Sequence, residues 1–361
     1  MEIVFNKNQK QLELLRAMAS RNKAESEQAQ QAFAAFISPV IQKVLNQSAN
    51  STLVYRDLEF DQDSDQSIPL DLYRGIGEDY IRVWSQTMPG GLPTNVTQGL
   101  SEFKFTTYTL DSAISFLKKY ARQARLDVVA AGLKRMSQEI LVKQETNAWA
   151  PLLYTLAVAS TNGLSHVISA TSAGTFQVDD MNRLATLIKR LYTSWAGGTP
   201  DMIDARGLTD IFVSPEITED IRAFAYEPMI REGVANSAGV PAVPLPPDVR
   251  SEIFRASMPS IYGIGIHELL ELGVNQKYNV LFDGFYQGSF DPSTQQIVIG
   301  VDLTRNGFIR PVEVNDDQGG GQVLVLPDDQ YVTRQDKIGF YAKVNEGRIV
   351  TDDRAICGII V

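Results

Sequence analysis

Apolar residues recur at intervals of three and four along the first 50 residues, which is the spacing of one face of an α-helix. The stripe begins at Leu12 and ends near Val40, and Phe33 and Phe36 are its bulkiest members. Because proline has no backbone N–H to donate, Pro39 is expected to break or kink the second half. The pattern predicts a helical arm over residues 1–50 that packs on its own body or on a neighbouring molecule.

Residues 51–110 change to short alternating runs separated by turn residues. The runs 80–84 and 102–108 have the composition of strands, and the second alternates apolar and polar positions. Between them lies a turn-forming cluster that contains Met88, Gly90, Gly91 and Pro93. This stretch predicts a long hairpin or an extended loop whose tip is the cluster.

The most regular helical pattern covers residues 110–147. Two adjacent apolar stripes start at Ile114 and Leu126, no proline interrupts them, and Thr109 or Asp111 can cap the start. At about 1.5 Å per residue, such a helix would be about 50 Å long. The apolar-leaning run 149–160 that follows predicts a buried helix or a pair of strands.

The remainder alternates helices and strands irregularly. Asp179 opens a helix whose apolar face runs to Leu191, and a buried strand at 209–215 leads into a helix at Pro215 that Ser214 can cap. Residues 227–250 predict a long loop. Short strands are expected at 280–282, 296–301, 322–326, 337–344 and 356–361. Since no βαβ regularity appears, the fold class is α+β.

Composition narrows the class of protein. A chain of 361 residues fits two or three packed units, and 44% hydrophobic with 21% charged residues is ordinary for a globular protein. No run approaches 18 apolar residues and no leader pattern is visible, so no membrane association is expected. The net charge of -10, from 33 basic and 43 acidic residues, argues against a protein that grips nucleic acid.

Motifs for catalysis or metal binding are incomplete. The carboxylates Asp61, Asp63 and Asp65 begin a calcium-loop pattern, but the glycine and the final glutamate that it needs are missing. His267-Glu268 begins a zinc-protease pattern that lacks its second histidine, and the chain has only two histidines and one cysteine. We therefore expect no catalytic, metal or cofactor site. An α+β enzyme whose carboxylates meet only in the folded chain stays open as an alternative.

The order of parts resembles a known family: helical arm, extended loop, long helix, α+β body and closing strands. It is similar to the major capsid proteins of tailed bacteriophages, which have the Hong Kong 97 capsid fold that encapsulins share. The local resemblance is greatest in four runs, 209–216, 296–301, 336–347 and 354–361. These look like strands, a helix and a hairpin of the family's axial and peripheral domains.

The resemblance implies a layout for the whole chain. The implied parts are an N-terminal arm (1–50), an extended loop (51–108), a peripheral domain with a spine helix (109–174 and 310–352) and an axial domain (175–309 and 353–361).

The resemblance also implies function and partners. The chain would self-assemble into pentamers and hexamers of an icosahedral head, made in the host cytoplasm and located in the virion, that encloses double-stranded DNA. Since the chain begins with only a short arm, a separate scaffolding protein is expected, and portal and cement proteins are possible partners. Residues 1–50 and 111–145 are each net basic and would face the genome in weak, non-specific contact. An encapsulin-type compartment that encloses proteins is the alternative.

Two further expectations concern contacts between subunits. The candidate assembly residues are Met88, Gly90, Gly91 and Pro93 at the loop tip and Phe33 and Phe36 in the arm. Some family members join a loop lysine to a neighbour's asparagine. Asn345 lies in a suitable hairpin, but residues 88–99 contain no lysine, so no such isopeptide bond is expected.

Overall fold

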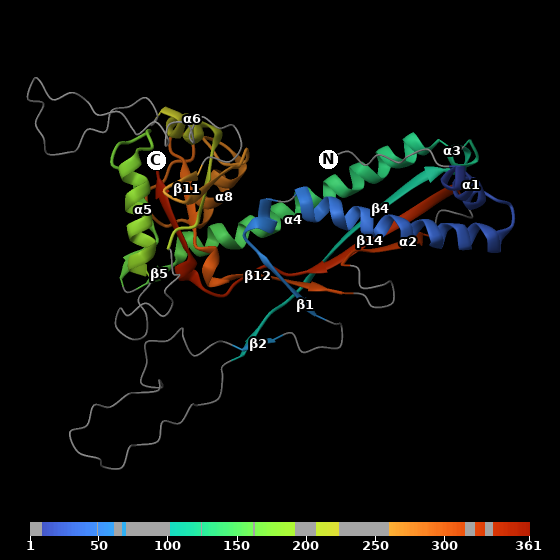
Figure 1. Ribbon diagram of the computed structural model, residues 1–361, viewed down its shortest axis with the longest axis horizontal. Helices are drawn as coiled ribbons and strands as arrows, with labels where there is room; N and C mark the ends of the chain where they lie inside the picture. Colours follow the sequence, from blue (N-terminus) through green and yellow to red (C-terminus); the bar gives the residue numbers. More distant parts are fainter. Residues whose placement is uncertain are drawn as a thin grey trace, which may run out of the picture. The chain divides into compact units, whose positions relative to one another are not determined.

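A computed structural model describes residues 9–48, 50–60, 67–69, 102–123, 125–161, 163–191, 207–223, 260–314, 322–328 and 335–361 (Figure 1). The chain divides into two compact units. Unit 1 comprises Met1–Ile68, Lys104–Trp149 and Phe308–Ile349, and unit 2 comprises Pro69–Phe103, Ala150–Gly307 and Val350–Val361. The loop cluster 88–93, the run 80–84, the carboxylates 61–65 and the loop 227–250 lie outside the described residues.

The described helices and strands mix without a βαβ repeat, as an α+β fold requires. In chain order the elements are α1 Gln9–Met18, α2 Lys23–Ser48, η1 Asn50–Leu53, β1 Arg56–Phe60, β2 Ser67–Pro69, β3 Glu102–Lys104, β4 Tyr108–Leu117, α3 Lys118–Arg122, α4 Leu126–Val158, β5 Ser160–Thr161, β6 Leu164–Ser165, β7 Val167–Ser169, α5 Val178–Leu191, β8 Asp210–Val213, α6 Pro215–Ala223, β9 Ser260–Ile261, β10 Ile264–Glu268, α8 Lys277–Phe285, β11 Ile297–Val301, η3 Leu303–Arg305, β12 Phe308–Glu313, β13 Leu324–Asp328, β14 Lys337–Glu346, β15 Ile349–Val350, η6 Asp353–Ala355 and β16 Ile356–Ile360.

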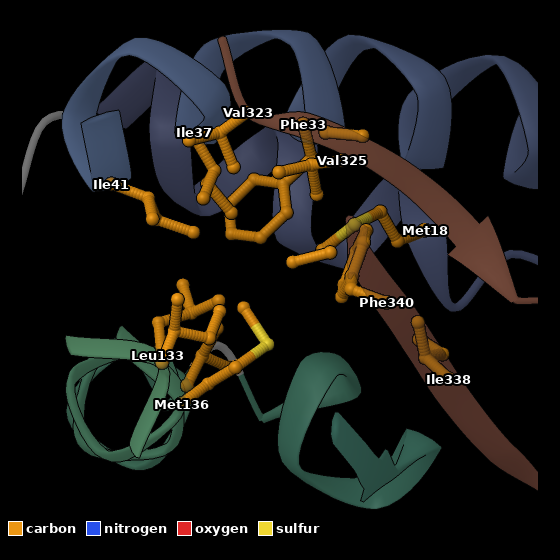
Figure 2. Packing of buried hydrophobic residues seen from close by; sticks show 14 of the residues in the cluster. Met18, Phe33, Ile37, Ile41, Leu133, Met136, Val323, Val325, Ile338 and Phe340 are labelled. Carbon is orange, nitrogen blue, oxygen red and sulfur yellow. The ribbon is translucent and has the colours of Figure 1, made fainter. Parts of the chain in front are cut away.

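Unit 1 is built on a sheet in the order β1-β12-β14-β13, in which β4 also pairs with β14 and β15 with β12. The helices α2 and α4 and the turn α3 pack their apolar side chains against the long strands β4, β13 and β14. Figure 2 shows Phe33, Ile37 and Ile41 of α2 pointing toward Leu133 and Met136 of α4. The arm therefore belongs to the core of unit 1.

Residues 108–117 form a strand, so the expectation of a helix from residue 110 is wrong there. The strand β4 pairs with β14 in antiparallel register along its full length, with Ile114 opposite Phe340 and Phe116 opposite Ile338. Alternate residues from Leu110 to Phe116 face inward while their neighbours are exposed. Leu110 and Ile114 are four residues apart, a spacing that fits one face of a helix and also one face of a strand. Pairing with β14 decides in favour of the strand.

The long helix consequently begins at Leu126 and runs for 33 residues to Val158. It passes through Pro151, and α2 passes through Pro39, so the expected break at Pro39 does not occur. Each proline removes one backbone hydrogen bond, and the apolar faces on both sides of it hold the helix together. Where α4 approaches β4, a Cβ at Gly132 would stand 2.5 Å from Ile114 Cδ1, so a larger residue there would require the end of the Ile114 side chain to move.

Unit 2 contains a second sheet in the order β7-β16-β11-β8-β10-β9. Its strands β8 and β10 are parallel, whereas β11 runs antiparallel to both β8 and β16. The helices α5 and α6 bury their apolar faces in one core with this sheet. Every residue of β11 and β16 is buried, as a central strand between two layers requires.

The helix opened by Asp179 is confirmed as α5, with Met181, Leu184 and Ile188 buried at helical spacing. The strand, cap and helix at 209–223 are confirmed as β8 and α6, and Ser214 Oγ accepts the backbone N–H of Ile217 at 3.2 Å.

The expected strand at 280–282 is wrong, because Lys277–Phe285 is the helix α8. Its buried Tyr278 and Phe282 stand four residues apart, and a window of three residues was too short to contain that period. None of the described helices is long and apolar enough to cross a membrane.

Candidate assembly surfaces

The two phenylalanines of the arm have different environments. Phe33 is 3% exposed and its ring lies 5.3 Å from the ring of Phe340 in β14. Phe36, three residues further along α2, is 44% exposed and lies toward the outer side of the helix. The core of unit 1 therefore accounts for Phe33, whereas Phe36 lies at the surface of α2.

The outer side of α2 carries a second set of small and apolar residues beside Phe36. Ala32, Ala35 and Pro39 are all exposed and follow helical spacing with it. The inner side buries Phe33, Ala34, Ile37 and Ile41. The exposed side of α2 is polar elsewhere, as at Gln28, Gln31 and Lys43, so its exposed apolar residues form a patch between positions 32 and 39.

Alanine substitutions should separate the two phenylalanines. We expect Phe33→Ala to lower the free energy of unfolding by about 3 kcal/mol, because it empties a buried ring site. Phe36→Ala should change it by less than about 1 kcal/mol. Urea unfolding monitored by circular dichroism tests both, and equal losses would contradict the assignment of Phe36 to an outer surface.

The strand β1 is a second exposed element of unit 1. It pairs in parallel with β12 at one edge of the sheet, and four of its five residues are exposed, including Leu58 at 39%. The predicted contact residues Met88, Gly90, Gly91 and Pro93 themselves lie outside the described residues. Their assignment to the assembly surface stays a prediction.

A buried ionic network supports this edge of unit 1. Glu346 of β14 is fully buried and accepts hydrogen bonds from Arg310 Nε at 2.8 Å, Gln144 Nε2 at 3.1 Å and the Tyr108 hydroxyl at 3.2 Å. Arg348 Nη2 lies at 3.4 Å from the same carboxylate. One carboxylate thus connects β4, α4, β12 and the end of β14.

The network extends to β1 and to an aromatic ring. Arg310 Nη1 lies 3.3 Å from Asp57, its register partner in β1, so the exposed strand is tied to the body by an ion pair. The guanidinium of Arg348 lies 5.0 Å from the centre of the Tyr55 ring. Burial, with the charge of Glu346 adding to it, raises the pKa of Tyr108 to about 12, and burial raises the pKa of Tyr55. Both hydroxyls therefore stay protonated near neutral pH.

Both histidines are held by hydrogen bonds in unit 2. His166 is buried, with Nδ1 at 2.9 Å from the Ile356 carbonyl and Nε2 at 2.8 Å from Thr161 Oγ1, and burial lowers its pKa. His267 Nε2 lies 2.8 Å from Asp210 and its ring stacks on Phe212. Burial alone would raise the pKa of Asp210, but the hydrogen bonds from His267 and Thr209 lower it overall.

The described residues contain no group of three or more potential metal-ligating histidine, cysteine, aspartate or glutamate side chains. Cys357, the one cysteine, is fully buried in the core of unit 2, where burial raises the pKa of its thiol. Glu268, the second residue of the incomplete zinc pattern, points to no second histidine and is exposed. Cys357 is therefore part of the packed core of unit 2, and Glu268 lies at its surface.

The two units differ in charge. In the described part of unit 1 the lysines and arginines outnumber the aspartates and glutamates, whereas in the described part of unit 2 the acidic residues are in excess. Among the bases of unit 1, Arg16 of α1 and Lys119 and Arg122 of α3 are exposed. Over its full length, however, unit 1 has as many acidic as basic residues, so the net charge of -10 comes from unit 2.

Unit 2 also has an exposed cluster that the sequence pattern did not reveal. We name the four residues Glu216, Glu268, Leu270 and Glu271 the acidic turn. All four are exposed, and Leu270, at 71%, is the most exposed large apolar side chain among the described residues. The two leucines after Glu268 are visible in the sequence, but the sequence does not show that Leu269 is buried and Leu270 exposed.

Comparison with known proteins finds likeness in structure alone. No protein-family model and no curated protein matches the chain. The capsid of an empty GTA particle matches with a TM-score of 0.53 at 12% identity, covering 87% of this chain and 90% of that one. The SrpI encapsulin of Synechococcus elongatus PCC 7942 has a TM-score of 0.49 at 13% identity, with coverages of 87% and 88%. The capsid of cyanophage P-SCSP1u has a TM-score of 0.48 at 11% identity, with coverages of 85% and 86%.

The match to the GTA capsid extends over nearly the whole of both chains. The described elements of this chain run from the arm helices through the long helix to the closing strands, which is the order that the sequence led us to expect. The chain therefore has the Hong Kong 97 capsid fold.

Proposed function

We propose that this chain is a shell-forming major capsid protein that assembles into the pentamers and hexamers of an icosahedral phage head around double-stranded DNA. The observation that carries the proposal is the fold match to a capsid over 87% of the chain. Sequence identity is too low to transfer function directly, so the surfaces of this chain must support the proposal as well.

Those surfaces suit a subunit of a larger assembly. The exposed side of α2 has an apolar patch over residues 32–39, and the edge strand β1 is exposed on both faces, with Leu58 among its exposed residues. Permanent interfaces often bury more than about 2,000 Å² and are rich in apolar contacts. Isolated monomers rarely keep such surfaces uncovered, because an exposed sheet edge pairs readily with other chains.

Exposed bases in the described part of unit 1 suit packaged DNA. Lysines and arginines on the surface neutralise phosphates without reading bases, and such binding weakens steeply with salt. Arg16, Lys119 and Arg122 are exposed and could make such contacts, while the acidic unit 2 would repel DNA. The DNA would be held weakly and without sequence preference.

The proposal includes no catalytic step and no cofactor. Separate scaffolding, portal and cement proteins are its expected partners. The host cytoplasm is the expected place of assembly, and the virion capsid the final location. An α+β enzyme with an unrecognised carboxylate pair is the competing class.

The test is purification of the full chain, followed by sedimentation and negative-stain microscopy, alone and with a co-expressed scaffolding protein. We expect closed particles with five- and six-fold clusters and, after expression with the phage packaging machinery, DNA that nuclease cannot reach. A protein enzyme found inside the particles in place of DNA would favour an encapsulin-type compartment. A chain that stays a 39.9 kDa monomer under all of these conditions would contradict both shell functions.

A further inference from the structure

The acidic turn lies at the end of unit 2 where the parallel strands β8 and β10 finish. Glu268 is the last residue of β10, and Leu270 and Glu271 follow in the turn. Glu216 is the second residue of α6, which starts two residues after β8 ends, and its carboxylate lies 3.0 Å from the point where a Cβ on Gly273 would stand. An exposed leucine thus stands between two exposed glutamates in the chain, a third exposed glutamate lies beside the end of the turn, and Lys277 of α8 is the base that follows the turn in the chain.

The other end of the same sheet carries exposed bases. Lys189 and Arg190 occupy the last turn of α5, and both are exposed. The side chain of Lys189 lies 3.0 Å from the point where a Cβ on Gly207 would stand, and Gly207 precedes the first residue of β8 by three positions. We name Lys189 and Arg190 the basic helix end.

The two clusters therefore lie at opposite ends of one rigid element. The basic helix end flanks the start of β8, and the acidic turn follows the end of β10, which runs parallel to β8. A cyclic ring needs two different, complementary surfaces on each subunit, because every subunit contacts one neighbour with each of them. Opposite charges at separate places on unit 2 meet this requirement.

We propose that the acidic turn binds the basic helix end of the next copy of this chain, with Leu270 as the apolar centre of the contact. The inference rests on the proposed shell function and names the residues of one contact within its rings. Exposed apolar anchors inside a polar rim are the usual organisation of such contacts. Opposite charges would bring the copies together and fix the direction of the ring.

Lys189 and Arg190 also stabilise their own helix, and the test must separate this effect from the contact between copies. A positive charge near the C-terminal end of a helix interacts favourably with the helix dipole, so Lys189 and Arg190 contribute to the stability of α5 without any neighbour. A loss of assembly on reversing these bases alone could come from a weaker α5. The acidic turn has no such ambiguity at Glu268 and Glu271, which lie outside helices.

The experiment uses three variants of the full chain: Glu268→Lys with Glu271→Lys, Lys189→Glu with Arg190→Glu, and all four changes together. Each double reversal replaces attraction by repulsion, and we expect the protein concentration needed for assembly to rise about fivefold to tenfold. The quadruple variant restores opposite charges with the direction exchanged and should assemble near the wild-type threshold. Light scattering and sedimentation at low and high salt measure the threshold, and salt should weaken wild-type assembly.

A matched control keeps the change in net charge and moves it elsewhere. Asp283→Lys with Glu139→Lys alters two exposed acids outside the acidic turn and should leave the assembly threshold unchanged. Leu270→Ser should raise the threshold while the unfolding midpoint stays at its wild-type value. If the wild type assembles and the double reversals assemble equally well, or if the quadruple variant is not restored although its melting curve is native, the inference is wrong and the shell function stands. If the wild type itself never assembles, the shell function fails.

Discussion

Replacing Phe340 by alanine is expected to lower the free energy of unfolding of unit 1 by about 3–5 kcal/mol. The ring is fully buried in β14, 5.3 Å from the ring of Phe33 and 6.0 Å from the ring of Phe116. Its strand is paired on one side with β4 and on the other with β13. The residue therefore joins the arm helix to the sheet at the centre of the core, where surrounding strands cannot collapse into the cavity (Figure 2).

The neighbouring residue supplies the control. Tyr341 points to the opposite face of β14, and its hydroxyl lies 3.4 Å from Asp111. We expect Tyr341→Ala to cost less than about 1 kcal/mol, because its site is partly solvated. Urea unfolding followed by far-ultraviolet circular dichroism measures both. Equal losses at positions 340 and 341 would show that the arm does not form one core with the sheet.

Replacing Glu346 by glutamine is expected to cost a similar amount, about 3–5 kcal/mol. The two side chains have nearly the same shape, so the change removes charge and leaves the volume in place. The side chains of Arg310 and Arg348 are 5% and 2% exposed. Arg310 would keep its ion pair with Asp57, which is 37% exposed, whereas Arg348 would lose the charge of Glu346. A buried guanidinium without its anion is destabilising, because the attraction that offset the cost of its desolvation is gone.

A double-mutant cycle with Arg348→Met tests the origin of that loss. Since both changes remove charge from one network, the double variant should be less destabilised than the sum of the two single variants. Glu139→Gln, at an exposed position of α4, is the control and should fall within about 0.5 kcal/mol of the wild type. Strict additivity in the cycle, or a Glu346→Gln variant as stable as the wild type, would mean that the ionic network contributes little to holding β1.

Several elements could be predicted from local pattern. The helix α5, the strand β8 with its Ser214 cap, and the strands β11, β14 and β16 all have periods or turn residues that point to one structure. Their boundaries moved by only a residue or two. Local preference and final packing agree in these segments, which is why a pattern of neighbouring residues is sufficient there.

Other segments satisfied two patterns at once. Residues 108–117 fit a helix and a strand equally, and β14, more than two hundred residues later, supplies the hydrogen bonds that make them a strand. The run at 280–282 was too short for its period to be read, and the helix α8 became visible only with Tyr278 included. A contact distant in sequence decided the first case, since no local window contains β14, whereas a longer local window would have been sufficient for the second.

The sequence by itself determined the α+β class, the order of the parts, and through that order the resemblance to capsid proteins that the fold confirms. Only the tertiary structure decided which member of each apolar pair is buried: Phe33 is in the core and Phe36 outside it, and Leu269 is buried and Leu270 exposed. It also brought Glu346 to Arg310 and placed the acidic turn and the basic helix end at opposite ends of one sheet. The physical reason is that periodicity reports whether a residue belongs to a face, whereas burial and charge pairing depend on what the rest of the chain places against that face.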